Sequence, residues 1–350
     1  MEADVLNLRA GDMVEVRSRE EILTTLDKEG KLDALPFMPE MLKYCGQQLK
    51  VIKRAHKTCD TISKTGGRSM KNAVHLEGVR CDGEAHGGCQ AECLIFWKEA
   101  WLRPAQSTSS GKSAVNADGM VRSQAIETAG DQGSHCSEET LRRASRRHSE
   151  STASGQERFV CQATELLNAT RPLAWWDIRQ YITDVSSGNA SIGELIRVFL
   201  FSMFSKTLKL RGYRAKVWLF NRIQRFRGGT PFPATDGTLT KTPVATLNLR
   251  AGELVEIKTQ DEIRSTVNRD AKTRGLSFDR EMVRYCGGRY KVRSRVEKII
   301  NERTGEMMSL PGDCIILDGV VCTSRYSPRR LLCPRSIYPF WREIWLKRVQ

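Results

Sequence analysis

The sequence lacks the features that mark several large classes of protein. No apolar run reaches the roughly 18 residues that span a bilayer, and the opening MEADVLNLRAGDMVEV has no basic stretch before an apolar core. A Gly-rich phosphate loop, a G-x-S-x-G elbow and an H-E-x-x-H helix are also missing. Their absence argues against the common nucleotide hydrolases, serine hydrolases and zinc proteases. We therefore expect a cytoplasmic chain, and a binding protein rather than an enzyme.

Positive charge and cysteine are abundant instead. The 350 residues carry 56 Lys and Arg against 41 Asp and Glu, a net charge of +15, and they include 11 cysteines. A basic balance favours acidic partners such as nucleic acid, anionic lipid or acidic protein. In the cytosol thiols stay reduced, and clustered cysteines more often bind metal than form disulfides.

The chain repeats itself at a constant offset of 241 residues. LNLRAGDMVEVRSREEI at residues 6–22 matches LNLRAGELVEIKTQDEI at residues 247–263. Both copies end alike, in FWKEAWLRP and FWREIWLKRV. We therefore predict two copies of one module, at residues 1–104 and 246–350, each of a length typical of a single domain.

Each module is predicted to be mainly β with a short helix. DMVEVRS and ELVEIKT alternate apolar and polar residues after an Ala-Gly turn, which is the pattern of a half-buried strand. In SREEILTTLD, Ser18 precedes an amphipathic run and is expected to cap a helix. Short strands with glycine turns and one small helix suggest a small, partly open β-barrel. The AGDxVEV opening resembles the first strand of SH3-like and KOW barrels.

Two different segments lie between the modules. Residues 105–157 are rich in Ser, Gly, Ala and Arg with few large apolar residues, so we predict a disordered linker. Residues 158–232 are predicted to be structured and partly helical. They are also basic, since no acidic residue occurs from Leu195 to Thr235.

Residues 195–227 interleave these cations with aromatic side chains. An anionic membrane surface fits such a basic amphipathic helix and would make the protein peripheral at the membrane. An acidic protein partner also fits the charge, and nucleic acid fits cations interleaved with stacking rings. The simplest alternative is a helix that packs on a β module and solvates its cations. The sequence identifies no small-molecule substrate.

The densest group of soft ligands lies in the first module. It comprises His56, Cys59, His75, Cys81, His86, Cys89 and Cys93. At the matching places the second module keeps cysteine only as Cys322 and Cys333, opposite Cys81 and Cys89. The module can therefore fold without most of these ligands, and their presence in the first copy requires another reason.

Metal binding is the simplest reason. Zn²⁺ takes four nitrogen or sulfur ligands, often from turns that present them at short spacing. We predict a structural zinc site whose ligands are Cys59, Cys81, Cys89 and Cys93. The same thiols can hold an Fe–S cluster. The three histidines can complete a second shell, bind another ion or act as acid–base groups; they are His56, His75 and His86.

The whole arrangement resembles a family of uncharacterised bacterial proteins. The resemblance rests on two AGxxVEV…EEI…EM…YCG modules around CQATEL…WWDxRQY, with HKTCD and HGGCQAECLIFWKEAW in the first. It implies one architectural unit and no established activity. We expect a metal-binding adaptor or accessory protein built from tandem SH3-like modules. Two alternatives stay open: an enzyme using an Fe–S cluster or an open metal site, and a KOW-like RNA-binding protein.

Overall fold

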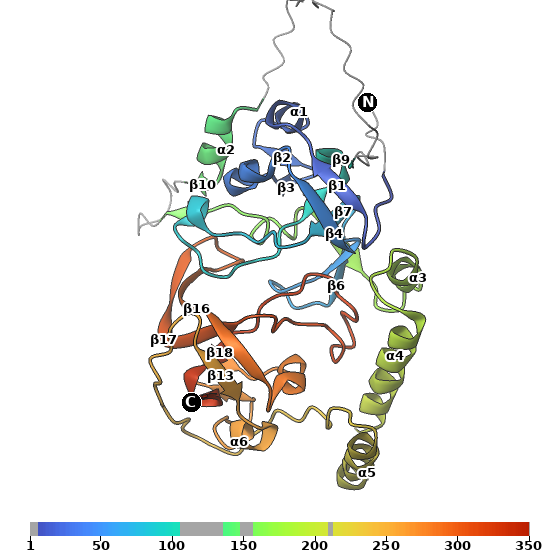
Figure 1. Cartoon of the computed structure of the whole chain (residues 1–350), viewed down its shortest axis with the longest axis vertical. Coiled ribbons are helices and arrows are strands. Elements are labelled where there is room, and N and C mark those ends of the chain that lie inside the picture. Colours follow the sequence, from blue (N-terminus) through green and yellow to red (C-terminus); the bar gives the residue numbers. More distant parts are fainter. Residues whose placement is uncertain (1–5, 106–135, 148–156, 209–212, 350) are drawn as a thin grey trace, which may run out of the picture.

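The computed structural model describes residues 6–105, 136–147, 157–208 and 213–349 (Figure 1). The chain is mixed α/β, with two antiparallel sheet regions and a helical middle segment. Figure 1 shows the sheets toward opposite ends of the long axis and three helices along one edge. We call residues 6–105 the N-terminal unit and residues 246–349 the C-terminal unit.

The N-terminal unit is organised by a five-stranded antiparallel sheet of order β8-β7-β4-β1-β9. In β1, Val14 and Val16 are fully buried whereas Met13 is exposed. One side of the strand therefore faces the core, as the alternating sequence predicts. The sheet strands are β1 (Met13–Val16), β4 (Gln48–Arg54), β7 (Ala73–Leu76), β8 (Trp97–Lys98) and β9 (Leu102–Pro104).

Short elements connect these strands. The helix predicted after Ser18 is α1 (Arg19–Thr24), and Ser18 forms a capping box with Glu21 at its start. The other elements are β2 (Lys31–Leu32), β3 (Leu35–Pro36), η1 (Pro39–Tyr44), β5 (Lys57–Cys59), β6 (Gly67–Ser69), η2 (Glu84–His86) and η3 (Glu99–Trp101). Two tryptophans with no exposed surface, Trp97 and Trp101, pack edge-on against Phe37 in the core.

The C-terminal unit has the same strand order, β18-β17-β16-β13-β19. Trp341 and Trp345, also without exposed surface, occupy its core. Its elements are β13 (Leu254–Ile257), α6 (Gln260–Arg264), β14 (Lys272–Thr273), β15 (Leu276–Ser277), η4 (Arg280–Tyr285), β16 (Arg289–Ile300), β17 (Met307–Leu317), β18 (Trp341–Arg342), η5 (Glu343–Trp345) and β19 (Leu346–Arg348).

The predicted β class with helices is confirmed at the level of these two antiparallel sheets. Within the described ranges, neither sheet closes into a barrel, because the outer strands of each five-stranded order do not pair with one another. The strands at these edges are only two or three residues long, which gives few ladder hydrogen bonds for closure.

Part of the segment predicted to be a disordered linker is structured. Residues 136–147 contain α2 (Glu138–Ala144) and β10 (Arg146–Arg147), and β10 pairs with β11 (Arg158–Phe159). Ser137 caps the helix, and Leu141 is buried against the N-terminal unit. Cys136 is buried in the same cluster, so this stretch is anchored to the N-terminal unit and the linker prediction is wrong for it. The rest of it, residues 106–135 and 148–156, lies outside the described residues.

The middle segment bridges the two units. It contains β12 (Arg171–Leu173), α3 (Arg179–Ser186), α4 (Ile192–Thr207) and α5 (Tyr213–Phe226). Asp184 of α3 accepts a buried hydrogen bond from Lys57 (2.5 Å), and Glu194 of α4 pairs with Arg325 (2.9 Å). No helix in the described part of the chain is both long and apolar enough to cross a membrane.

Candidate metal centre

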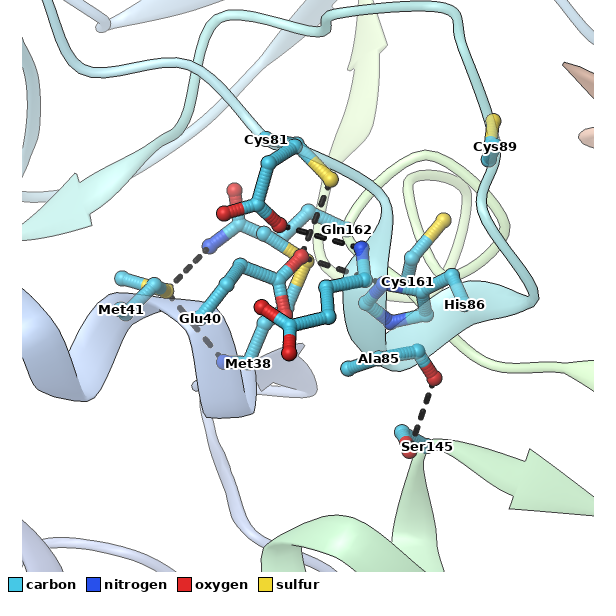
Figure 2. Close-up of polar contacts among 12 residues, drawn as sticks. Met38, Glu40, Met41, Cys81, Ala85, His86, Cys89, Ser145, Cys161 and Gln162 are labelled. Carbon is cyan, nitrogen blue, oxygen red and sulfur yellow. Dashed lines mark hydrogen bonds and ion pairs between the residues drawn. The ribbon is translucent and has the colours of Figure 1, made fainter.

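Three ligand atoms from separate parts of the N-terminal unit converge at one point (Figure 2). Glu40 comes from η1, Cys81 follows the bridge between Arg80 and Leu94, and His86 ends η2. One atom of each lies within 4.8 Å of the others, and no other group of three or more among the described residues meets that criterion. These three side chains can hold a metal ion.

A tight loop brings Cys81 and His86 together. Cys81 N–H donates to Cys93 O (2.9 Å), which closes residues 81–93 into one loop. Inside it, Gly83 accepts from the backbone N–H of His86 (2.9 Å) and has φ +74°. A Cβ at Gly83 would lie 2.0 Å from Cys89 O, so only glycine fits this turn.

The imidazole of His86 is oriented as metal-binding histidines are. Its Nε2 lies 3.1 Å from Val160 O, so this nitrogen carries the hydrogen and donates to the carbonyl. Nδ1 lies 3.1 Å from Glu40 Oε1, so it donates to this carboxylate when the ring is protonated and offers its lone pair to a cation once that proton is lost. The side chain of His86 is 1 % exposed, so the ring is held in place by its surroundings.

Glu40 is buried with unused hydrogen-bonding capacity. Its Oε1 accepts from the Cys81 thiol (2.9 Å), while Oε2 finds no hydrogen-bond partner in the described chain. Burial by itself would raise the pKa of Glu40, but His86 and Cys81 outweigh it and the pKa lies below the ordinary value. Burial and Glu40 together raise the pKa of the Cys81 thiol well above its usual range. A bound cation would replace the thiol proton and satisfy the free carboxylate oxygen.

The matching position in the C-terminal unit shows a different use of the same carboxylate. Glu281, 241 residues after Glu40, accepts from the backbone N–H groups of Arg325 (3.1 Å) and Tyr326 (2.7 Å). The Ser327 hydroxyl donates to it as well (3.3 Å). Both oxygens of this carboxylate are therefore satisfied by the loop itself, and a cation is not needed there.

A small cavity of about 40 Å³ adjoins two of the three ligands, Cys81 and His86. Three more cysteines line it: Cys89, Cys93 and Cys161. Cys161 follows Val160, the residue that accepts from His86, and Figure 2 shows it beside that ring. Burial raises the pKa of Cys93 to about 11 and that of Cys161 to about 12, so both thiols are neutral without a metal.

The loop that carries the site also docks the C-terminal unit. Gln90 N–H donates to Lys298 O (3.0 Å), and Gln90 Oε1 accepts from the backbone N–H of Lys298 (3.1 Å). The Ser294 hydroxyl donates to Glu92 (2.8 Å). This loop is therefore one of the regions of the N-terminal unit that contact strand β16.

Of the seven ligands predicted from sequence, the structure brings Cys81 and His86 into the group and lines the adjoining cavity with Cys89 and Cys93. Cys59 lies elsewhere, at the end of β5. A hydrogen bond with Cys333, with Arg335 and Arg330 nearby, lowers the pKa of Cys59 to about 6 although burial opposes it.

The other two histidines have separate structural partners. His56 Nε2 donates to Gln180 O (3.0 Å) at the start of α3, and burial lowers its pKa to about 4. His75 is fully buried on β7, where Nδ1–H donates to Ile95 O (2.8 Å). Burial lowers the pKa of His75 to about 3. Neither ring belongs to the three-residue group.

Two residues were not predicted: Glu40 in the group of three, and Cys161 in the adjoining cavity. Glu40 had a signal: an acidic residue stands between apolar neighbours in PFMPEML and recurs in FDREMV of the second copy. Cys161 had none beyond being a cysteine outside the first module.

No protein-family model matches the chain, and comparisons with curated proteins and with solved structures find no match. The chemistry of the centre must therefore be inferred from its own atoms. One thiol, one imidazole and one carboxylate make a mixed donor set, suited to a divalent transition metal rather than to Ca²⁺ or Mg²⁺.

Proposed function

We propose that this protein is a zinc-binding accessory or adaptor protein made of two SH3-like modules. Glu40, Cys81 and His86 hold the ion. The observation that carries the proposal is a buried ligand triad whose carboxylate keeps one oxygen without a partner. Zn²⁺ accepts sulfur, nitrogen and oxygen donors in one tetrahedron, which suits this mixed set.

The modules are proposed to be SH3-like because of their strand order. In each unit four strands follow one another across the sheet, and the fifth returns to pair with the first. A 3₁₀ turn, η3 or η5, precedes that returning strand in both. The match at an offset of 241 and the shared topology together support descent of the two units from one duplicated module.

The size of the cavity favours a structural ion over a catalytic one. Substrate pockets usually measure about 300–1,000 Å³, whereas the space beside the triad is about 40 Å³. That volume accommodates a water molecule or two. The loop around the ion instead contacts β16 through Gln90 and Glu92, so zinc would keep the two units in one arrangement.

An Fe–S cluster has less support. Such clusters are held mainly by cysteine thiolates, and the converging group contains a single thiol, that of Cys81. Cys59, which the cysteine-only set requires, lies with Cys333 outside the group.

Metal analysis of the full chain tests the site. We expect one zinc per chain, lost in Glu40→Gln and Cys81→Ser. The matched controls, Glu281→Gln and Cys322→Ser, change the same positions of the C-terminal unit and should keep one zinc. With Co²⁺ as a probe, the thiolate-to-metal absorption should be lost in Cys81→Ser and persist in Cys322→Ser.

A metal-free wild-type chain, or equal loss in the site variants and the matched controls, would refute the assignment. The structural role has its own test. A chelator should lower the melting temperature of the wild type but leave that of Cys81→Ser unchanged. A chelator that removes zinc without moving the wild-type melting temperature would favour an exchangeable, catalytic ion instead.

A further inference from the structure

Large apolar side chains are exposed mainly on the helical middle segment. Of the seventeen exposed large hydrophobic residues in the described chain, thirteen lie between Trp175 and Phe226. Figure 1 shows α3, α4 and α5 along one edge of the molecule, outside the two β units. Soluble proteins rarely leave such a concentration of apolar surface in water unless it binds a partner.

Helix α4 has two opposite faces. Its inner face packs Val198 with Leu331 and Leu332 of the C-terminal unit. Its outer face carries a stripe with the spacing i, i+4, i+8 and i+11, which places four side chains on one side of the helix. The members and their exposed fractions are Ile192 (63 %), Ile196 (54 %), Leu200 (62 %) and Met203 (64 %).

The tryptophans divide sharply between core and surface. Four of them have no exposed surface and lie in the cores of the two units: Trp97, Trp101, Trp341 and Trp345. The remaining three all belong to the middle segment: Trp175 (41 %), Trp176 (70 %) and Trp218 (60 %). Tryptophan favours the boundary between water and hydrocarbon, where its ring is apolar and its N–H stays hydrated.

Cations lie on the same helices as this apolar surface, and Lys206 and Arg222 lie over the rings of Trp175 and Trp218. No acidic residue occurs from 195 to 235. Seven described cations fall in that range: Arg197, Lys206, Arg214, Lys216, Arg222, Arg225 and Arg227. None of the seven forms an ion pair with a described acidic side chain. Lys209 and Arg211 lie outside the described residues.

We propose that α3, α4 and α5 form a docking surface for an anionic lipid bilayer. The stripe on α4 enters the boundary of the acyl chains, the exposed tryptophans lie at headgroup depth, and the unpaired cations contact anionic headgroups. Charge complementarity selects this occupant. A second copy of the chain would bring like-charged cations face to face, which disfavours self-association. Isoleucine, leucine and methionine form the stripe on α4, and these side chains do not stack on nucleic acid bases; the exposed tryptophans lie beside this aliphatic stripe, as at a lipid boundary.

Vesicle flotation with the full chain tests the proposal. We expect binding to vesicles of phosphatidylcholine and phosphatidylserine in a 7:3 ratio, and little binding to phosphatidylcholine alone. Raising NaCl from about 0.1 to 0.5 M should weaken binding, because the contact between surface charges is screened. Arg222→Gln should weaken it about fivefold, the effect of one cation near an anionic surface.

Substitutions in the stripe separate docking from general surface change. Leu200→Glu and Met203→Glu place a carboxylate where lipid is expected, and each should reduce binding at least about tenfold. The controls of the same residue types are Leu254→Glu and Met308→Glu, which are also exposed (42 % and 38 %) but lie on the C-terminal unit. They should bind as the wild type does. All four positions are exposed, so the fold is expected to persist, and circular dichroism checks it.

Tryptophan fluorescence gives an independent readout. Acrylamide reaches only the three exposed tryptophans, so anionic vesicles should reduce quenching in the wild type and much less in Leu200→Glu. The proposal is overturned by any of three results: absence of vesicle binding at low salt, equal binding to neutral vesicles, or a lipid-free dimer that Leu200→Glu dissociates. If vesicle binding is absent and single-stranded RNA binds instead, nucleic acid replaces the bilayer as the partner. Zinc content is measured separately, so failure here leaves the metal assignment untouched.

Discussion

The buried imidazole of His75 should make the protein less stable in mild acid, by an amount that one variant can isolate. The pKa of this histidine is about 3 in the folded chain because burial penalises its charge, and nearby Lys53 and Arg335 add repulsion. In the unfolded chain it is near 6.5. Between these values the unfolded state binds the proton and the folded state does not, so the free energy of unfolding falls as the pH falls. From pH 7 to pH 5 the loss from this group is about 2 kcal/mol.

His75→Asn removes the titration while its amide can still donate to Ile95 O. Urea unfolding, followed by tryptophan fluorescence at pH 7 and pH 5, gives the free energy of unfolding of each protein. Other titrating groups, including His56 and Asp184, affect both proteins alike and cancel in the comparison. We expect the stability advantage of the wild type over the variant to shrink by about 2 kcal/mol on acidification. An advantage that is the same at both pH values would mean that His75 is not buried as a neutral ring.

Two further predictions concern the loop of the metal centre and the core of the C-terminal unit. Gly83→Ala should abolish zinc binding and lower the melting temperature, because the new Cβ would overlap Cys89 O. The control is Gly78→Ala, which is also at positive φ but has no atom near the new Cβ. It should keep the metal and lower the free energy of unfolding by only about 1 kcal/mol. Glu343→Ala should lower the free energy of unfolding in urea by about 3–5 kcal/mol. This fully buried carboxylate accepts hydrogen bonds from three consecutive backbone N–H groups and pairs with Arg295 (2.5 Å). A loss below about 1 kcal/mol would contradict that role.

The sequence was sufficient for elements whose signal is local. Alternation in DMVEV predicts β1, and the Ser18 cap predicts α1, because each pattern reports which side chains one strand or one turn must bury or satisfy. The prediction for residues 136–147 was wrong because α2 depends on a distant contact. Leu141 and Cys136 are buried against the N-terminal unit, and the composition of the stretch does not reveal these contacts.

The spacing of cysteines and histidines in the sequence predicted some wrong ligands, because residues that are close in the chain need not be close in space. Cys59 precedes the cluster by only 22 residues, yet strand β5 carries its thiol to Cys333 of the other unit. His75 is nearer still, but its position on β7 directs the ring to Ile95 O in the core. Glu40 is 41 residues before Cys81 and is a ligand candidate because η1 and the loop pack together. Only the path of the chain distinguishes these cases.

The two matched glutamates separate what the fold needs from what the site adds. Glu281 ties down its loop through backbone N–H groups, so an acid at this position of η4 has a structural use without any metal. At Glu40 the residues facing the acid are Cys81 and His86, and one oxygen has no partner among the described residues. Burying a carboxylate in that state costs stability unless something compensates the charge. The N-terminal unit therefore lacks the carboxylate-to-backbone hydrogen bonds that fix the loop of the C-terminal unit, and its carboxylate keeps an oxygen that a cation can bind.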